Sequence, residues 1–143
     1  MVVRFNLVIL LSFVMMLFVS CGTSPNGSTN QENSSLQSQI DTKTTDLFIS
    51  INEKEYESFS TNLDQDMSEK FTQEVFNDMC LNLLTHYGKY KSHYAINTEE
   101  IDHFISVQYE VKFELKDNVK VTLIYQPDEP NDISGLWIDG PEF

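Results

Sequence analysis

The spacing of apolar residues changes at Gly88 from a helical period to a strand period. Between Asp46 and Lys70, apolar residues recur mostly at three- and four-residue steps, which predicts an amphipathic helical segment with a break near Asp64. The recurring residues are Leu47, Phe48, Ile51, Tyr56, Phe59, Leu63 and Met67.

A second helix is predicted between Thr72 and Gly88. Thr72 suits the N-cap, and Glu74 places a negative charge in the first turn, where the helix dipole favours it. Gly88 suits the position just after the helix, because a left-handed backbone costs glycine nothing. The apolar stripe between them consists of Val75, Phe76, Met79, Cys80, Leu83, Leu84 and Tyr87.

Strict alternation of apolar and polar residues follows. It predicts a half-buried strand from Ile105 to Leu115, a tight turn at Asp117-Asn118 and a returning strand from Val119 to Tyr125. The apolar parity of this hairpin carries no acid and no histidine. The only polar groups on the apolar parity are tyrosine hydroxyls: those of Tyr109 and Tyr125 in the hairpin and that of Tyr94 in the preceding strand.

Two further strands complete the predicted sheet. Tyr90, Tyr94 and Ile96 alternate with polar residues, and Ile133 to Ile138 form a short strand after a proline-containing acidic loop at 127–132. Helices followed by antiparallel strands predict an α+β fold, in which two or three helices pack on a curved antiparallel sheet of about four strands.

The amino terminus carries a secretion signal. Its apolar run from Leu7 to Val19 would span only about 20 Å as a helix, less than the roughly 30 Å of a bilayer core. The end of the run, Phe18-Val19-Ser20-Cys21-Gly22, resembles the lipobox of bacterial lipoproteins, although the usual leucine is replaced by Phe18. The resemblance implies cleavage after residue 20 and a lipid on Cys21, which would anchor the chain on the extracytoplasmic face of the cell membrane.

A polar tether is predicted between the anchor and the domain. Of the 24 residues from Gly22 to Thr45, 19 are Ser, Thr, Asn, Gln, Gly or Pro, so this segment has too little apolar surface to offset its chain entropy. Leu36 and Ile40 are spaced i, i+4, which leaves open an earlier start of the first helix. The predicted division is therefore a signal peptide at 1–20, a lipidated cysteine and tether at 21–45, and a domain at 46–143.

Charge excludes some classes of partner. Residues 21–143 hold 22 acids and 8 bases, a formal charge of −14, and this argues against nucleic-acid binding and against unaided adsorption to anionic lipid. With Cys21 lipidated, Cys80 has no disulfide partner in the chain, and its place in a helical apolar stripe predicts that it packs as a small hydrophobe.

The domain resembles the cone-shaped fold of nuclear transport factor 2 and ketosteroid isomerase, and more narrowly a bacterial lipoprotein family of unknown function within that superfamily. The resemblance lies in the order of helices and strands and in three structural motifs. These are Tyr56-x-x-Phe59 with Leu63 and Met67, Leu83-x-x-x-x-Gly88-x-Tyr90, and Ile133-x-Gly135-Leu136-Trp137-Ile138-x-x-Pro141. It implies a cystatin-like cone over 46–143, and the superfamily includes enzymes, adaptors and inert modules alike.

We expect a non-catalytic module that binds a small molecule or a protein. The candidate lining of the cone consists of aromatic residues with polar tips: Tyr90, Tyr94, Tyr109, Tyr125 and Trp137. The alternative is an isomerase or hydro-lyase of the ketosteroid isomerase type, which needs a carboxylate or histidine beside a tyrosine hydroxyl in a cavity. His86, His93 and Asp102 are the residues that could supply this group, although their orientation does not follow from the sequence.

Neither a cofactor nor a metal is predicted. His86, His93 and His103 lack the spacing that gathers ligands. The run Asp64-x-Asp66-x-Ser68 starts like a calcium loop but continues with Glu69 where glycine is required. The expected partners are the membrane, through the lipid, an unidentified small molecule or protein, and, through the sheet, a second copy of the chain.

Overall fold

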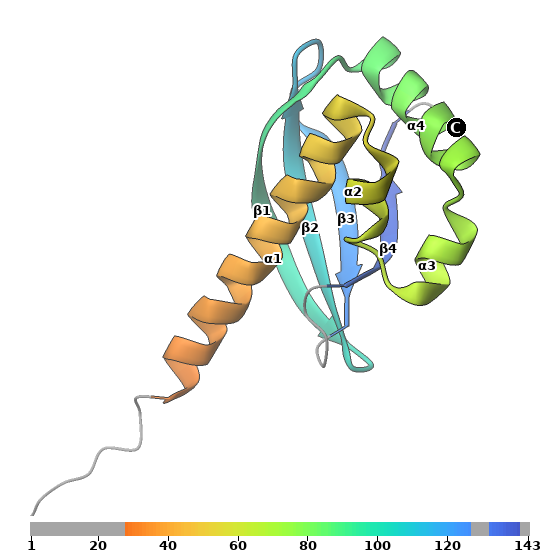
Figure 1. The fold of residues 1–143 in the computed structure, drawn as a ribbon. Helices are drawn as coiled ribbons and strands as arrows, with labels where there is room; N and C mark the ends of the chain where they lie inside the picture. The colour runs from red at the N-terminus through yellow and green to blue at the C-terminus, as the bar shows by residue number, and fades with distance from the viewer. Residues whose placement is uncertain (1–27, 127–131, 141–143) are drawn as a thin grey trace, which may run out of the picture.

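A computed structural model describes residues 28–126 and 132–140. In these ranges four helices pack against one curved antiparallel sheet with the strand order β1-β2-β3-β4, which confirms the predicted α+β fold (Figure 1). The helices are α1 (Ser28–Glu53), α2 (Tyr56–Ser60), α3 (Gln65–Lys70) and α4 (Gln73–His86). The strands are β1 (Tyr90–Ile101), β2 (Phe104–Phe113), β3 (Val119–Tyr125) and β4 (Ile133–Ile138).

The first helix begins earlier than the tether prediction placed it. From Ser28 on, the segment predicted as coil is helical, as the spacing of Leu36 and Ile40 had left open. Ile40 and Thr44 are buried against the sheet, so this part of α1 gains tertiary contacts that its composition does not reveal. The amino-terminal turns of α1 extend beyond the sheet as a stalk (Figure 1).

The helical segment after Asp46 is divided twice. Lys54 has a positive φ of 58° and ends the regular path of α1. Asp64 caps α3 by accepting a hydrogen bond from the Met67 N–H at 2.7 Å, at the predicted break. Thr72 caps α4 in the same way, and Gly88 adopts a φ of 74° after it, as predicted.

The central hairpin follows the predicted parity through Phe113 and then departs from it. Val107, Tyr109, Val111 and Phe113 are buried, as are their partners in β3. Leu115, expected on the inner face, is exposed, because the backbone after Phe113 turns back and Leu115 N–H donates to Tyr87 O at 2.8 Å. A two-residue turn at Asp102-His103, both with positive φ, joins β1 to β2.

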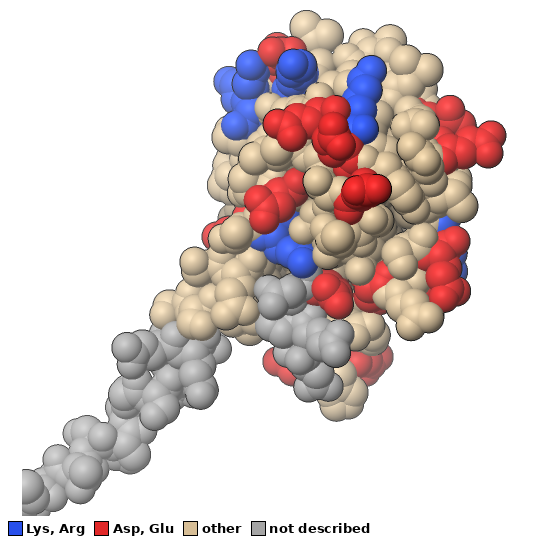
Figure 2. All heavy atoms as spheres, in the orientation of Figure 1, with Lys and Arg blue, Asp and Glu red and all other residues tan. Residues whose placement is uncertain are grey.

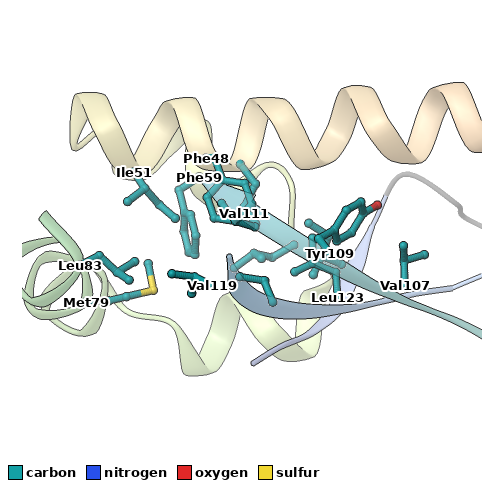
Figure 3. Close-up of a cluster of buried hydrophobic side chains, with 14 of the residues drawn as sticks. Phe48, Ile51, Phe59, Met79, Leu83, Val107, Tyr109, Val111, Val119 and Leu123 are labelled. Atoms are coloured by element: carbon teal, nitrogen blue, oxygen red, sulfur yellow. The ribbon is translucent and has the colours of Figure 1, made fainter. Parts of the chain in front are cut away.

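The core lies between the concave face of the sheet and the helices. Figure 3 shows Phe48 and Ile51 from α1, Phe59 from α2 and Leu83 from α4 pointing toward the inner side chains of β2 and β3. Phe59 and Phe76 have ring centroids 4.6 Å apart, and they join α2 to α4 at the centre of this cluster. The α4 helix packs most closely on α1 and α2, and Leu83 also reaches the inner side chains of the sheet.

Candidate functional site

A groove of about 750 Å³ separates α4 from β4, the edge strand of the sheet. Its volume lies within the range of small-molecule and peptide pockets, about 300–1,000 Å³. The lining is mainly apolar and consists of Phe71, Val75, Asp78, Met79, Leu81, Asn82, Leu136, Trp137, Ile138 and Asp139. Three of these side chains are unusually open for apolar residues, since Val75 is 44% exposed, Trp137 58% and Leu81 62%.

One face of the α4 helix packs in the core, and another face lines the groove. Phe76, Cys80 and Leu83 are buried against the other helices and the sheet. Val75, Asp78 and Asn82 follow a second stripe at i, i+3 and i+7, and this stripe faces the groove. The helix is thus held from one side while apolar side chains on another remain accessible.

The β4 strand forms the opposite wall and has an open edge. Its first residue is already paired, because Ile133 N–H donates to Asn62 O at 2.9 Å and Asp64 N–H donates to Ile133 O at 3.1 Å. Further along, Asp139 N–H donates to Lys120 O at 2.8 Å on the β3 side. Since hydrogen-bonding pairs alternate in an antiparallel ladder, Leu136 and Ile138 direct their N–H and C=O groups away from β3.

Nothing else in the described ranges bonds to those four backbone groups. They are therefore available to a strand that lies beside β4. The side chains of Leu136 and Ile138 share the inner face with their β3 partners Leu123 and Val121, whereas Trp137 is opposite Thr122 on the outer face.

The polar part of the groove is negative. Asp78 from α4 and Asp139 after β4 line it, and no lysine or arginine is among its lining residues. The face in Figure 2 shows acids distributed over much of the domain, with several lysines near the top and others beside acids lower down. A bound group that carries a positive charge would be favoured over one that carries a negative charge.

A separate polar cluster lies in the core beneath α1. Thr44 Oγ1 is 2.6 Å from the Tyr125 hydroxyl oxygen and donates to the Tyr109 hydroxyl at 3.1 Å. All three residues are fully buried, and burial raises the pKa of both tyrosines. The cluster satisfies hydroxyl groups that would otherwise be unpaired in the core, and its three residues do not line the groove between α4 and β4.

His93 points inward beside this cluster, an orientation that the sequence did not establish. Its Nδ1 is 2.7 Å from the Tyr90 hydroxyl oxygen, and its ring meets that of Tyr109 edge-on at 5.0 Å. Burial lowers the pKa of His93 below 6.5, and the charge of Asp41 opposes this shift. A histidine within hydrogen-bond reach of a tyrosine is the pair that the isomerase alternative requires.

The cause of this orientation is a bulge in β1. The register shifts between Tyr90 and Ser92, so that His93 is opposite Val111 and Tyr94 is opposite Glu110. Tyr94 is consequently 57% exposed on the outer face, where its hydroxyl donates to the Glu110 carboxylate. The prediction that Tyr94 lies on the inner parity is wrong for this reason.

The five aromatic candidates are not brought together. Tyr109 and Tyr125 are packed in the core, and Tyr90 is half-buried with its ring stacked on Phe48 at 4.8 Å. Tyr94 lies on the outer face, and Trp137 lines the groove at β4. The sequence placed Val75 on the apolar core stripe of α4, whereas it is exposed and lines the groove, and the sequence reasoning missed Asp78 and Asn82, which follow Val75 at i+3 and i+7.

The remaining candidates from the sequence are the Cys80 thiol, a metal site and the membrane anchor. Cys80 is buried, and desolvation raises the pKa of its thiol to about 11. In the ranges described, no three His, Cys, Asp or Glu side chains converge, and no helix is both long and apolar enough to cross a bilayer. The predicted signal peptide and Cys21 lie outside the described residues.

Comparison with known proteins identifies one family. A family model described as a protein of unknown function, DUF3887, matches residues 45–136. No curated protein and no solved structure matches the chain. The match covers all of α2–α4, all of β1–β3 and the groove-lining residues up to Leu136. The chain therefore belongs to the DUF3887 family.

Proposed function

We propose that the chain is a lipid-anchored extracytoplasmic protein whose domain binds an apolar ligand or protein segment in the groove between α4 and β4. The observation that carries this proposal is the exposure of Val75, Leu81 and Trp137 around one concave surface. Exposed apolar residues that cluster in a groove mark interaction sites far more often than isolated ones do. The proposed role is binding and not catalysis, because the two carboxylates that line the groove, Asp78 and Asp139, have no tyrosine, histidine or cysteine beside them among the lining residues.

The membrane anchor is supported by the amino-terminal residues. A short apolar run that ends in Ser20-Cys21-Gly22 fits cleavage and acylation at the cysteine. An acyl anchor and an elongated α1 would together hold the domain at some distance from the lipid headgroups. Bacterial membrane extracts should therefore contain a peptide that begins at Cys21 and carries acyl mass, and Cys21→Ser should abolish that mass and release the chain from the membrane.

Ligand binding can be followed through the single tryptophan of the chain. Trp137 lines the groove, so its fluorescence reports directly on occupancy. The full chain in phosphatidylcholine nanodiscs is titrated with phenylbutanol, a neutral apolar probe, and we expect a saturable change in emission. Val75→Arg should reduce this change by filling the groove, whereas Leu115→Ala, which removes an exposed apolar side chain that does not line the groove, should not. An unsaturable response, or equal responses in both variants, would refute the groove as a binding site.

The second candidate function is a ketosteroid-isomerase-like isomerase or hydro-lyase. The pair of His93 Nδ1 and the Tyr90 hydroxyl at 2.7 Å favours it, because it places a base beside a hydrogen-bond donor. This function requires α1 to move so that substrate reaches the pair. Proton–deuterium exchange at the carbon next to the carbonyl of a cyclic ketone, lost in His93→Gln and retained in His86→Gln, would support it. No exchange above that of buffer would exclude it for this substrate class.

A further inference from the structure

We infer that the occupant of the groove is an extended segment of another polypeptide, which adds to the sheet as a fifth strand beside β4 and carries a lysine or arginine toward Asp78 and Asp139. This inference rests on the proposed function of the groove and specifies its ligand. The unpaired edge of β4, the apolar lining and the acidic rim each contribute one step to it.

The backbone of β4 supplies the first step. Leu136 and Ile138 present two N–H and two C=O groups to the groove side, and no described backbone group uses them. An extended peptide satisfies such groups with a ladder of its own, whereas a small apolar molecule leaves them to water. The pairing of Ile133 with residues 62–64 already extends the sheet in this direction at the start of the strand.

The dimensions of the two walls agree with a strand of this kind. The groove is lined by four residues at and just after the end of β4, Leu136 to Asp139, which span about 13 Å, and by the part of α4 from Val75 to Asn82, which spans about 12 Å. A peptide segment of about four residues would therefore run along both walls. The groove volume of about 750 Å³ is also sufficient for a short extended segment in contact with both walls.

The side chains of the two walls define an alternating pattern for the ligand. Leu136 and Ile138 face inward, on the side where α4 contributes Val75 and Met79. Every second residue of an added strand would face these four side chains, since strand side chains alternate between faces. Apolar residues at alternate positions are therefore required, while the residues between them face outward on the side of Trp137.

Charge determines the remaining feature of the ligand. Asp78 and Asp139 face the groove without a lysine or arginine among the lining residues. A cation on the peptide offsets this charge, and an acid there would be repelled. The same argument disfavours a second copy of this chain as the occupant, because two copies would bring their own aspartates together.

The test uses the full chain in phosphatidylcholine nanodiscs and a capped heptapeptide in which valine alternates with threonine and the last residue is lysine. We expect saturable binding that changes Trp137 emission and slows hydrogen exchange of the Leu136 and Ile138 amides. Empty nanodiscs and the Val75→Arg variant are the controls, and neither should give this response. Binding that persists in Val75→Arg would place the peptide elsewhere and overturn the inference.

Backbone pairing is tested with two N-methylated versions of the peptide. One is methylated on the valine amides and the other on the threonine amides, so each loses the donors of one strand edge. Only one edge can face β4, and we expect one version to bind at least about tenfold more weakly than the other. Equal affinities would show that the peptide does not add as a strand.

The charge requirement is tested by exchange of signs. Replacing the lysine of the peptide by glutamate should weaken binding by about fivefold, and the double variant Asp78→Lys, Asp139→Lys should reverse the preference. The double variant Glu53→Lys, Glu57→Lys changes net charge equally but away from the groove, and it should keep the original preference. A reversal in both variants would mean that net charge, and not the groove, selects the peptide.

These outcomes separate the two proposals. If phenylbutanol binds at Trp137 and the peptide does not, the groove is a site for small apolar ligands and the strand inference fails alone. If neither binds, both fail. If Trp137 emission and the mass by light scattering both depend on the concentration of the protein itself, a second copy occupies the groove, and the inference is overturned.

Discussion

The indole ring of Trp137 lies against Gly135, its neighbour two residues earlier on the same face of β4. A Cβ atom on Gly135 would overlap the six-membered ring of the indole and would approach Ile124 Cγ1 to 3.2 Å. The absence of a side chain at Gly135 thus leaves room for the indole beside it, and Trp137 remains 58% exposed and lines the groove.

Substitution of this glycine should disturb both stability and the groove. We expect Gly135→Ala to lower the free energy of unfolding by about 1–3 kcal/mol through steric overlap, measured by urea denaturation. In a Trp137→Ala background the same substitution should cost less, because the overlapping ring is gone. Equal costs in both backgrounds would assign the effect to Ile124 or to the backbone.

Thr44 should be far more important for stability than Thr42, the exposed threonine two residues earlier on α1. Its hydroxyl bonds to Tyr109 and Tyr125 in the core, so Thr44→Val leaves tyrosine hydroxyls without this partner and should cost about 1–3 kcal/mol in urea denaturation. Thr42 makes the same i−4 bond to a helix carbonyl but is exposed, and Thr42→Val serves as the matched control with a change near zero. A similar loss in both variants would show that the helix bond, and not the core cluster, is responsible.

The early start of α1 predicts a specific cost at Ile40. This side chain is buried, and Ile40→Ala should lower the free energy of unfolding by about 2–5 kcal/mol. Leu36, one turn earlier, is only partly buried, and Leu36→Ala should cost clearly less. If Ile40→Ala leaves the free energy of unfolding unchanged, this part of α1 does not pack on the domain and is the flexible tether that its composition indicates.

The free energy of unfolding should decrease as the pH is lowered, and part of this decrease should depend on His93. Burial lowers the pKa of His93 in the folded chain, so the unfolded chain binds the proton more tightly. The stabilisation from the neutral ring is complete above pH 6.5 and is lost as the pH falls below that value toward the folded pKa. The wild type should therefore lose more unfolding free energy than His93→Gln between about pH 7.5 and pH 5. Identical pH profiles would contradict this, and His86→Gln, which alters an exposed histidine, should match the wild type.

Cys80 should be inert toward thiol reagents in the folded chain. Desolvation raises its pKa to about 11, and its side chain is buried, so both the thiolate fraction and access are low. Alkylation by iodoacetamide, followed by mass spectrometry in a Cys21→Ser chain, should be slow in buffer and rapid in urea. Equal rates would mean that α4 opens readily.

The hairpin of β2 and β3 could be predicted from sequence because its positions as far as Phe113 follow a single parity. Val107, Tyr109 and Val111 face the core as the alternation indicated, but residues 114–118 connect the strands, where the sequence predicted a tight turn at Asp117-Asn118. The cap at Thr72 and the left-handed Gly88 are equally local, since each depends on the chemistry of one residue. Strand parity, helix caps and left-handed glycines can be predicted because each is determined by residues close together in the sequence.

The candidate site depended on tertiary structure and was predicted only in part. A bulge after Tyr90 shifts the register of β1, so that Tyr94 faces outward and His93 faces inward. No residue type in that strand predicts a bulge. Trp137 was predicted to line a cone interior, whereas it lines the groove beside β4. The groove exists because α4 packs on the helices and leaves β4 uncovered, a relationship between elements about 50 residues apart.

The stalk formed by the first turns of α1 couples distance to direction, because in a helix each added residue lengthens the path by about 1.5 Å and also turns everything beyond it by about 100°. Insertion of one alanine between residues 34 and 35 would therefore rotate the domain relative to the first turn of α1 far more than it would move the domain away from that turn. Four inserted alanines would lengthen the stalk by about 6 Å and nearly restore the original orientation.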